Sequence, residues 1–253
     1  MNMKWKLLMI GFCFISNFIF AQDDAIKPNP FQPEIDAFAK ADKINMPDEG
    51  KILFAGSSSF RLWKDVNDYF PGKPILNRGF GGATLLDLIQ YSKETIIQYH
   101  PKQIFIYCGE NDIADNDTVK PKDVFHRFKK LYTILRTQLP ASTPIVFLSL
   151  KPSIARWSMH ERMEGANILI KNFISTQKNI QFLDVYSAML GADGLPLNDI
   201  FIADKLHMNA KGYSIWQKLI APLLLQGEKP VLNTHSGKVA GFKEDVRVLS
   251  KIY

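Results

Sequence analysis

Cysteine is scarce in this 253-residue chain, which contains only Cys13 and Cys108. Cys13 lies in an apolar N-terminal segment, and removal of that segment would leave a single cysteine. An internal disulfide is then excluded, so packing alone must hold the fold. The P-loop pattern Gly-x-x-x-x-Gly-Lys-Ser/Thr is also absent, which excludes a P-loop nucleotide enzyme.

Apolar runs long enough to cross a bilayer are also lacking. The longest run extends from Leu7 to Phe20, follows Lys4 and Lys6, and ends at Ala21. A membrane-spanning helix needs about 20 apolar residues, whereas this shorter run with a basic start is typical of a cleaved secretory signal. We expect residues 1–21 to be a signal peptide and the protein to be periplasmic or extracellular, without a stable membrane anchor. Retention as an uncleaved anchor is the alternative.

Charge of one sign is nowhere concentrated. The net charge is +6, and loss of Lys4 and Lys6 would leave 29 basic against 25 acidic residues, a net charge of +4. Without a basic run of five or more residues, no nucleic-acid partner is expected. His100, His126, His160 and His235 are scattered without ligand spacing, so we expect no metal and no cofactor.

Elements of two kinds alternate along the chain. Residues 22–50 are rich in Pro, Asp and Lys and are interpreted as an N-terminal leader over the surface, with one helix near residues 33–42. Five short apolar runs then follow, as expected for strands that are buried on both faces. They are Ile52–Ala55, Ile75–Leu76, Ile104–Cys108, Ile145–Leu150 and Ile180–Val185.

Segments of helical period separate or follow these runs. Apolar residues recur at helical spacing over residues 124–139, 163–174 and 213–224. The alternation predicts one α/β domain over residues 51–230, with a parallel sheet between helices and an appended segment at 231–253. Ligands of such sheets bind beyond the carboxyl ends of the strands.

Four polar segments follow strands or precede the last helix, where this rule places a site. They are Gly56-Ser57-Ser58-Ser59, residues 77–82 (Asn-Arg-Gly-Phe-Gly-Gly), Gly109-Glu110-Asn111-Asp112, and Asp204-Lys205-Leu206-His207. Taken singly, each has an ordinary interpretation as a helix cap or tight turn. Together they supply a nucleophile, a base, an orienting carboxylate and oxyanion donors, the groups that acyl transfer needs.

These four segments resemble, in order and separation, the four conserved blocks of the SGNH (GDSL-type) hydrolases. The resemblance implies a flavodoxin-like three-layer α/β/α sandwich with a five-stranded parallel sheet of order 2-1-3-4-5. It also implies a catalytic triad of Ser58, Asp204 and His207. The oxyanion hole would consist of the Ser58 and Gly82 N–H groups and the Asn111 amide. Ser57 departs from the Asp that many members carry before the nucleophile, which bears on substrate preference more than on activity.

The predicted function is that of an exported serine esterase that removes small acyl groups, such as acetyl, from carbohydrate esters. Phe60, Arg61, Trp63 and Phe80 are candidate substrate-binding residues, with core packing as the alternative for Trp63. Arg61 and Arg78 are candidate anion-binding residues, with a solvated surface as the alternative. Rival functions are a lysophospholipase, a non-catalytic glycan- or lipid-binding domain, and a flavin-binding electron carrier.

Overall fold

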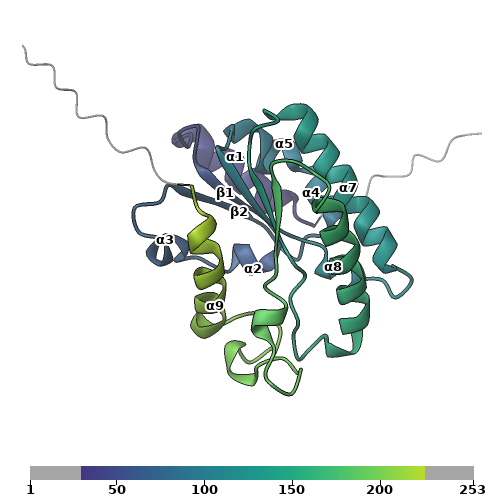
Figure 1. The fold of residues 1–253 in the computed structure, drawn as a ribbon. Helices are drawn as coiled ribbons and strands as arrows, with labels where there is room; N and C mark the ends of the chain where they lie inside the picture. Colours follow the sequence, from purple (N-terminus) through teal and green to yellow (C-terminus); the bar gives the residue numbers. More distant parts are fainter. Residues whose placement is uncertain (1–29, 226–253) are drawn as a thin grey trace, which may run out of the picture.

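A computed structural model describes residues 30–225 of the chain (Figure 1). The predicted signal peptide, the first part of the predicted leader, and the segment 231–253 lie outside the described residues. None of the helices between residues 30 and 225 combines the length and apolar character that a bilayer crossing needs.

The core of the structure is a five-stranded sheet with the order β2-β1-β3-β4-β5, in which every neighbouring pair is parallel. This confirms the predicted fold class. The strands are β1 (Ile52–Gly56), β2 (Ile75–Gly79), β3 (Gln103–Tyr107), β4 (Ile145–Leu148) and β5 (Ile180–Leu183). Strand β2 extends beyond its short apolar run because Asn77 and Arg78 continue the pairing with β1.

Helices cover both faces of the sheet, and their bounds follow the sequence periodicity closely at the long helices. The α-helices are α1 (Gln32–Ile44), α2 (Ser58–Arg61), α3 (Val66–Tyr69), α4 (Leu85–Gln90), α5 (Ser92–Thr95), α6 (Glu110–Ala114), α7 (Pro121–Gln138), α8 (His160–Ile174) and α9 (Ala210–Ile220). Short 3₁₀ turns are η1 (Ile97–Tyr99), η2 (Trp157–Met159), η3 (Ser187–Met189), η4 (Asn198–Ile200) and η5 (Ala221–Leu223).

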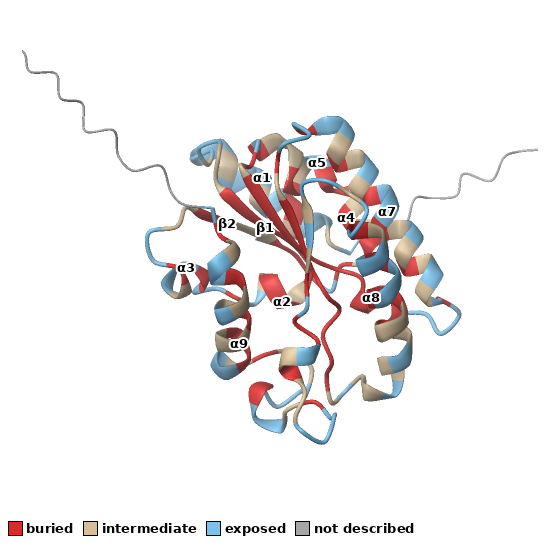
Figure 2. Ribbon diagram, viewed as in Figure 1, coloured by how far each residue is buried: buried red, intermediate tan, exposed pale blue. Residues whose placement is uncertain are grey.

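Two hydrophobic clusters fill the space between the sheet and its helices. The inner strands β1, β3 and β4 are buried along their whole length, whereas the outer strands β2 and β5 are partly exposed (Figure 2). Successive strand side chains point to opposite faces. Thus Leu53 and Ala55 join the cluster under α1, α4, α7 and α8, whereas Ile52 and Phe54 join the cluster under α2, α3 and α9. We call these the α7–α8 face and the α2–α9 face.

Candidate active site

The predicted site residues come together at the carboxyl ends of the strands. Ser58 begins α2 directly after β1, and Gly82 lies between β2 and α4. Asn111 is in α6 after β3, and His207 precedes α9. The parallel sheet therefore brings segments that are far apart in sequence to one edge.

A glycine lets the chain turn from β1 into the segment of Ser58. Gly56 has a φ of 141°, and a Cβ at this position would lie 2.0 Å from the Tyr107 carbonyl oxygen of the neighbouring strand. Any other residue would clash with that backbone and strain its own. Gly56 thus sets how closely the turn after β1 approaches β3.

Ser58, His207 and Asp204 form a continuous hydrogen-bonded chain. Ser58 Oγ lies 3.0 Å from His207 Nε2, and His207 Nδ1 lies 2.6 Å from Asp204 Oδ2. The imidazole remains 22% exposed, and Ser58 is partly buried. This arrangement can pass the hydroxyl proton to Nε2 while the carboxylate holds Nδ1–H, which is what a serine nucleophile requires.

The Asp204 carboxylate also shapes its own loop. Its Oδ1 accepts hydrogen bonds from the backbone N–H groups of Leu206 and His207, both at 2.9 Å. Partial burial alone would raise the pKa of Asp204, but the bonds from the His207 side chain and these two N–H groups lower it to about 2. Asp204 is therefore ionised at every pH near neutrality.

Donors for a developing oxyanion are present beside Ser58. Within residues 30–225, neither the Ser58 N–H nor the Gly82 N–H has a hydrogen-bond acceptor, and Gly82 is exposed. The Asn111 amide lies close by, since a Cβ on Gly82 would be 3.7 Å from Asn111 Nδ2. That Nδ2 donates to Ser57 Oγ and to the Ala83 carbonyl, each at 3.1 Å. An oxyanion would have to share or replace one of these two bonds.

Asp112 holds the Gly82 loop from the same segment as Asn111. Its carboxylate accepts a hydrogen bond from the Leu85 N–H at 2.8 Å and pairs with Arg127 at 2.7 Å. Burial raises the pKa of Asp112, and Arg127 opposes that rise. The Asn-Asp pair therefore ties the loop after β2 to the loop after β3.

The three aromatic candidates for substrate binding lie in the core, which corrects that expectation. Phe60, Trp63 and Phe80 are all 0% exposed. Trp63 stacks on Tyr213 at 4.7 Å between ring centroids, and Phe60 packs edge-on against Trp216 at 5.9 Å. Phe60, in α2, and Trp63, two residues after α2, thus pack the segment that begins at Ser58 against α9. Tyr213 strengthens this contact by donating from its hydroxyl to the Ser59 carbonyl at 2.9 Å.

The two arginines that were candidates for anion binding each pair with a carboxylate of the protein itself. Arg61 pairs with Glu34 at 2.7 Å, and Glu34 also accepts a hydrogen bond from the Gly81 N–H. Arg78 pairs with Asp42 at 2.5 Å. Both acidic partners come from α1, so this helix is bonded to the segments on either side of the site.

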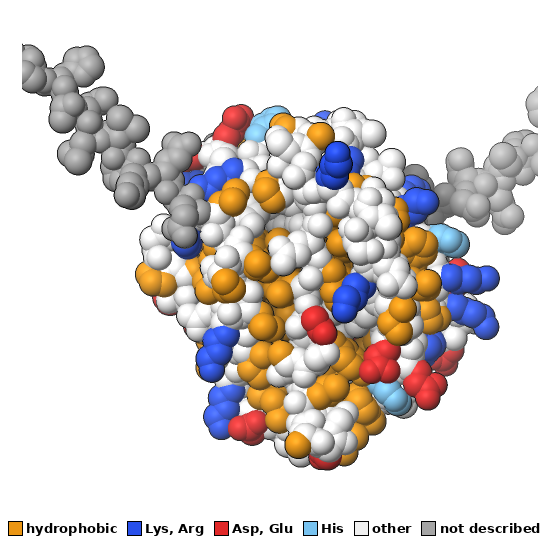
Figure 3. All heavy atoms as spheres, viewed as in Figure 1, with side chains coloured by type: hydrophobic (Ala, Val, Ile, Leu, Met, Phe, Trp, Pro, Cys, Tyr) orange, Lys and Arg blue, Asp and Glu red, His pale blue; other side chains and the backbone are white. Residues whose placement is uncertain are grey.

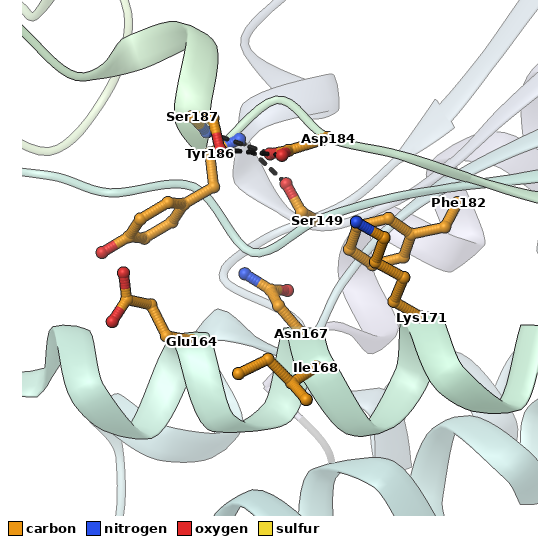
Figure 4. A pocket seen from close by; sticks show the side chains of 9 residues that line it. All are labelled: Ser149, Glu164, Asn167, Ile168, Lys171, Phe182, Asp184, Tyr186 and Ser187. Atoms are coloured by element: carbon orange, nitrogen blue, oxygen red, sulfur yellow. Dashed lines mark hydrogen bonds between the residues drawn. The ribbon is translucent and has the colours of Figure 1, made fainter.

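A cavity of about 300 Å³ lies between α8 and the ends of β4 and β5 (Figure 4). Its lining combines acidic, basic and aromatic side chains. They are Ser149, Glu164, Asn167, Ile168, Lys171, Phe182, Asp184, Tyr186 and Ser187. No predicted site residue lines this cavity, so it is separate from the Ser58–His207–Asp204 chain.

The surface offers no concentration of basic charge on the face seen in Figure 3, where Lys and Arg are interspersed with Asp and Glu. Apolar side chains gather on that face between α8 and α9.

Within residues 30–225, no three His, Cys, Asp or Glu side chains are grouped so that they could hold a metal ion.

Comparison with known proteins identifies the family to which the chain is similar. A sequence model described as the GDSL-like lipase/acylhydrolase family matches residues 53–215. The platelet-activating factor acetylhydrolase IB subunit alpha2 of Gallus gallus is 23% identical over 214 residues, which are 81% of this chain and 88% of that protein.

A second curated relative is much longer than the matched part. The N-acylneuraminate cytidylyltransferase of Escherichia coli is 28% identical over 178 residues, which are 68% of this chain. The match spans only 40% of that relative's length.

Two solved structures share the fold. A GDSL-like lipase from Bacteroides thetaiotaomicron superposes with a TM-score of 0.64 at 19% identity, covering 75% of this chain and 96% of that one. A catalytic mutant of an acetylxylan esterase from Geobacillus stearothermophilus gives a TM-score of 0.56 at 16% identity, covering 70% and 94%.

Proposed function

Because the chain belongs to the GDSL-like lipase/acylhydrolase family, we propose that it is a serine hydrolase of carboxylic esters with Ser58 as the nucleophile. The observation that carries this proposal is the continuous chain from Ser58 Oγ through His207 to Asp204, with contacts of 3.0 and 2.6 Å. If these residues were only helix caps and tight turns, there would be no reason for a serine and a histidine 149 residues apart in sequence to be hydrogen-bonded.

The geometry supports hydrolysis through an acyl-enzyme. His207 Nε2 removes the proton from Ser58 Oγ as that oxygen attacks the ester carbonyl. Asp204 keeps Nδ1 protonated and stabilises the imidazolium, since its lowered pKa keeps it ionised. The imidazolium then protonates the leaving alcohol. In the second half of the reaction the same nitrogen takes a proton from the attacking water and returns it to Ser58 Oγ as the acid is released.

The oxyanion of the tetrahedral intermediate would be bound by the N–H groups of Ser58 and Gly82 and by the Asn111 amide. The two N–H groups are ready to donate in the resting structure, whereas Asn111 must release or share its bond to Ser57. Hydrogen-bond donors that strengthen as charge develops act mainly on the transition state. No step of this mechanism uses a cofactor.

For the substrate, we favour small acyl groups, above all acetyl, on carbohydrate alcohols outside the cytoplasm. Two relatives are an acetylhydrolase and an acetylxylan esterase, so both names specify an acetyl group. The burial of Phe60, Trp63 and Phe80 also agrees with a small acyl group, because none of them lines an open acyl-binding surface. Export rests on the signal-like segment 1–21 alone.

The first experiment asks whether Ser58 is the nucleophile. Purified protein is treated with a fluorophosphonate probe and assayed on an aryl acetate, beside the Ser58→Ala variant. Wild type should be labelled and active, and Ser58→Ala neither. The matched control is Ser59→Ala, which removes a hydroxyl one position further along the same turn and should keep both. Equal labelling of Ser58→Ala and wild type would show that the nucleophile is another residue.

A second experiment separates the substrate classes. p-Nitrophenyl esters of two to sixteen carbons and acetylated xylo-oligosaccharides are compared by kcat/KM. Acetyl esters should be the best substrates, and rates should fall as the chain lengthens. A maximum at long chains would favour the lysophospholipase alternative, and binding of glycans without any turnover would favour the non-catalytic one.

A further inference from the structure

A group of four polar side chains, three of them buried, adjoins the proposed site. Glu110 and Lys151 are 5% and 1% exposed in their side chains, and Lys151 Nζ is 3.3 Å from Glu110 Oε2. Arg156 donates to Glu110 Oε1 at 2.9 Å, and the Tyr107 hydroxyl also donates to Glu110. Glu110 is therefore surrounded by donors from three other positions on β3 and on the segment after β4.

The Lys151 ammonium also contacts the loop from Asp204 to His207, which carries the proposed base. Its Nζ donates to the Leu206 carbonyl at 2.9 Å, and it lies 5.9 Å above the ring of Phe201. Leu206 stands between Asp204 and His207. One residue earlier, the Lys205 carbonyl accepts a hydrogen bond from the Ala155 N–H at 3.1 Å. Two successive carbonyls of the Asp204–His207 loop are thus held by the segment that follows β4.

Lys151 is itself firmly placed. The preceding residue, Leu150, is bonded through both its N–H and its carbonyl to the side-chain amide of Asn167 in α8, at 2.8 and 3.0 Å. Glu110, at the other end of the pair, directly precedes Asn111. The contact between Lys151 and Glu110 therefore joins the segment of the proposed oxyanion donor to the loop of the proposed base.

We propose that Lys151, held by Glu110, is a positioning residue that sets the Asp204–His207 loop at the correct distance from Ser58 and Asn111. The inference rests on the proposed esterase function. It concerns a residue that touches neither the substrate nor the reacting atoms and acts through the Leu206 carbonyl.

Stability alone is a weak explanation for such a pair. Removing two charges from water is costly, and well-packed apolar residues of similar volume often stabilise a fold as well or better. Burial alone would raise the pKa of Glu110, but Lys151 and Arg156 lower it, so this carboxylate is ionised. A buried ion pair with a third bond to a backbone carbonyl, however, has a strict geometry that apolar packing lacks.

The test compares three variants of the full chain. Lys151→Met removes the charge and the bond to Leu206, while Glu110 keeps Arg156 and Tyr107 as partners. Lys151→Gln removes the charge but retains an N–H donor, on a side chain that is one atom shorter. Arg136→Met is the matched control, because Arg136 also donates to two carbonyls, those of Thr143 and Asn179, but at the opposite edge of the sheet.

Each variant is assayed on an aryl acetate at a temperature well below its own unfolding midpoint. For Lys151→Met we expect kcat to fall about 10- to 100-fold with KM within about twofold, because misplacing a catalytic group by about 1 Å costs on this scale. Fluorophosphonate labelling should slow in parallel. Lys151→Gln should recover part of the loss, and Arg136→Met should keep the wild-type kcat even if its unfolding midpoint falls.

A folded Lys151→Met with kcat within twofold of wild type would overturn the inference, and so would an equal loss in Arg136→Met. If Lys151→Met does not fold, Lys151→Gln is compared with Arg136→Met in its place. A kcat of Lys151→Gln below that of Arg136→Met would support the inference, and an equal kcat would overturn it. Inactive wild-type protein that the probe does not label would instead refute the proposed function. Active, Ser58-dependent wild type beside an equally active Lys151→Met would refute the positioning role alone.

Discussion

The two faces of the sheet differ in the side chains that fill them and in the site groups that their loops carry. Among residues 30–225, the fully buried tryptophans Trp63 and Trp216 both lie on the α2–α9 face, whereas the α7–α8 face combines phenylalanines such as Phe128 with aliphatic residues such as Leu131 and Ile170. Ser58 and His207 adjoin helices of the α2–α9 face. Gly82 and Asn111 adjoin α4 and α6 on the other side.

This difference indicates how each pair is held. In the proposed mechanism Ser58 and His207 exchange a proton, and the segments that carry them are joined by large rings whose contacts have specific geometry, such as the Trp63–Tyr213 stack. In the same mechanism Gly82 and Asn111 only donate hydrogen bonds, and their loops are joined by polar contacts, including Asp112 to the Leu85 N–H. The substitutions below test this division from the largest expected effect to the smallest.

Loss of the proposed base should have the largest effect. His207→Ala should lower kcat by roughly 10⁵- to 10⁶-fold, as expected when one member of a cooperating triad is removed. Initial rates on an aryl acetate measure this loss. His126→Ala, which removes an exposed imidazole on α7, is the control and should remain fully active. Comparable losses in both variants would contradict the assignment.

Asp204→Asn should lower kcat by roughly 10⁴-fold, because the amide favours the wrong imidazole tautomer. The wild-type carboxyl has a pKa of about 2, below its value near 3.9 in an unfolded chain. Its stabilising contribution is therefore present above about pH 4 and is lost as the pH falls towards 2.

Urea unfolding between pH 3 and pH 7 tests this dependence. The difference in unfolding free energy between wild type and Asp204→Asn should level off near pH 5 and shrink below about pH 4. A difference that stays constant down to pH 3 would contradict the lowered pKa of Asp204.

On the opposite face, Asn111→Ala should lower kcat by roughly 10²- to 10³-fold with little change in KM, as for one lost oxyanion donor. Steady-state kinetics on one acetyl ester separates the two constants. The control is Asn172→Ala, which removes an exposed amide and should leave kcat unchanged. Asn167→Ala is unsuitable as a control, because it would remove both hydrogen bonds that the Asn167 amide makes to the Leu150 backbone. A rise in KM at constant kcat would assign Asn111 to ground-state binding.

The aromatic packing should matter for activity more than equally buried packing elsewhere. Trp63→Ala and Phe128→Ala should each lower the unfolding free energy by about 3–5 kcal/mol, since both side chains are fully buried. At a temperature where both are folded, Trp63→Ala should also lose about tenfold in kcat, because it loosens α2 against α9. Equal kcat values in the two variants would contradict a special role for the α2–α9 face.

The smallest effect is expected at Ser57, whose hydroxyl accepts a bond from the Asn111 amide. Ser57→Ala should lower kcat by about fivefold, because it removes one neutral hydrogen bond to the Asn111 amide, worth about 1 kcal/mol. Ser57→Ala combined with Asn111→Ala should be no worse than Asn111→Ala alone, because the two act through one contact. Additive losses of kcat in the double variant would show that Ser57 and Asn111 act independently.

Much of the fold and the central part of the proposed site could be predicted from the amino-acid sequence. The five apolar runs and the alternating helices indicated a doubly wound sheet, because burial on both faces demands continuous apolar strands. The polar segments after these strands contained Ser58, Gly82 and Asn111, and the same rule would have found Lys151, which follows the apolar run to Leu150. The sequence does not distinguish Lys151 from other lysines, because a single lysine after a strand ordinarily lies in solvent.

The sequence alone thus determined which residues carry reactive groups and at which edge of the sheet they lie, since strand period and strand-end chemistry are local properties. Only the tertiary structure decided that Phe60, Trp63 and Phe80 belong to the core, and that Arg61 and Arg78 pair with α1. It alone also placed the Lys151 ammonium between Glu110 and the Leu206 carbonyl. Burial and ion pairing depend on which distant elements pack together, and no spacing within one segment records that.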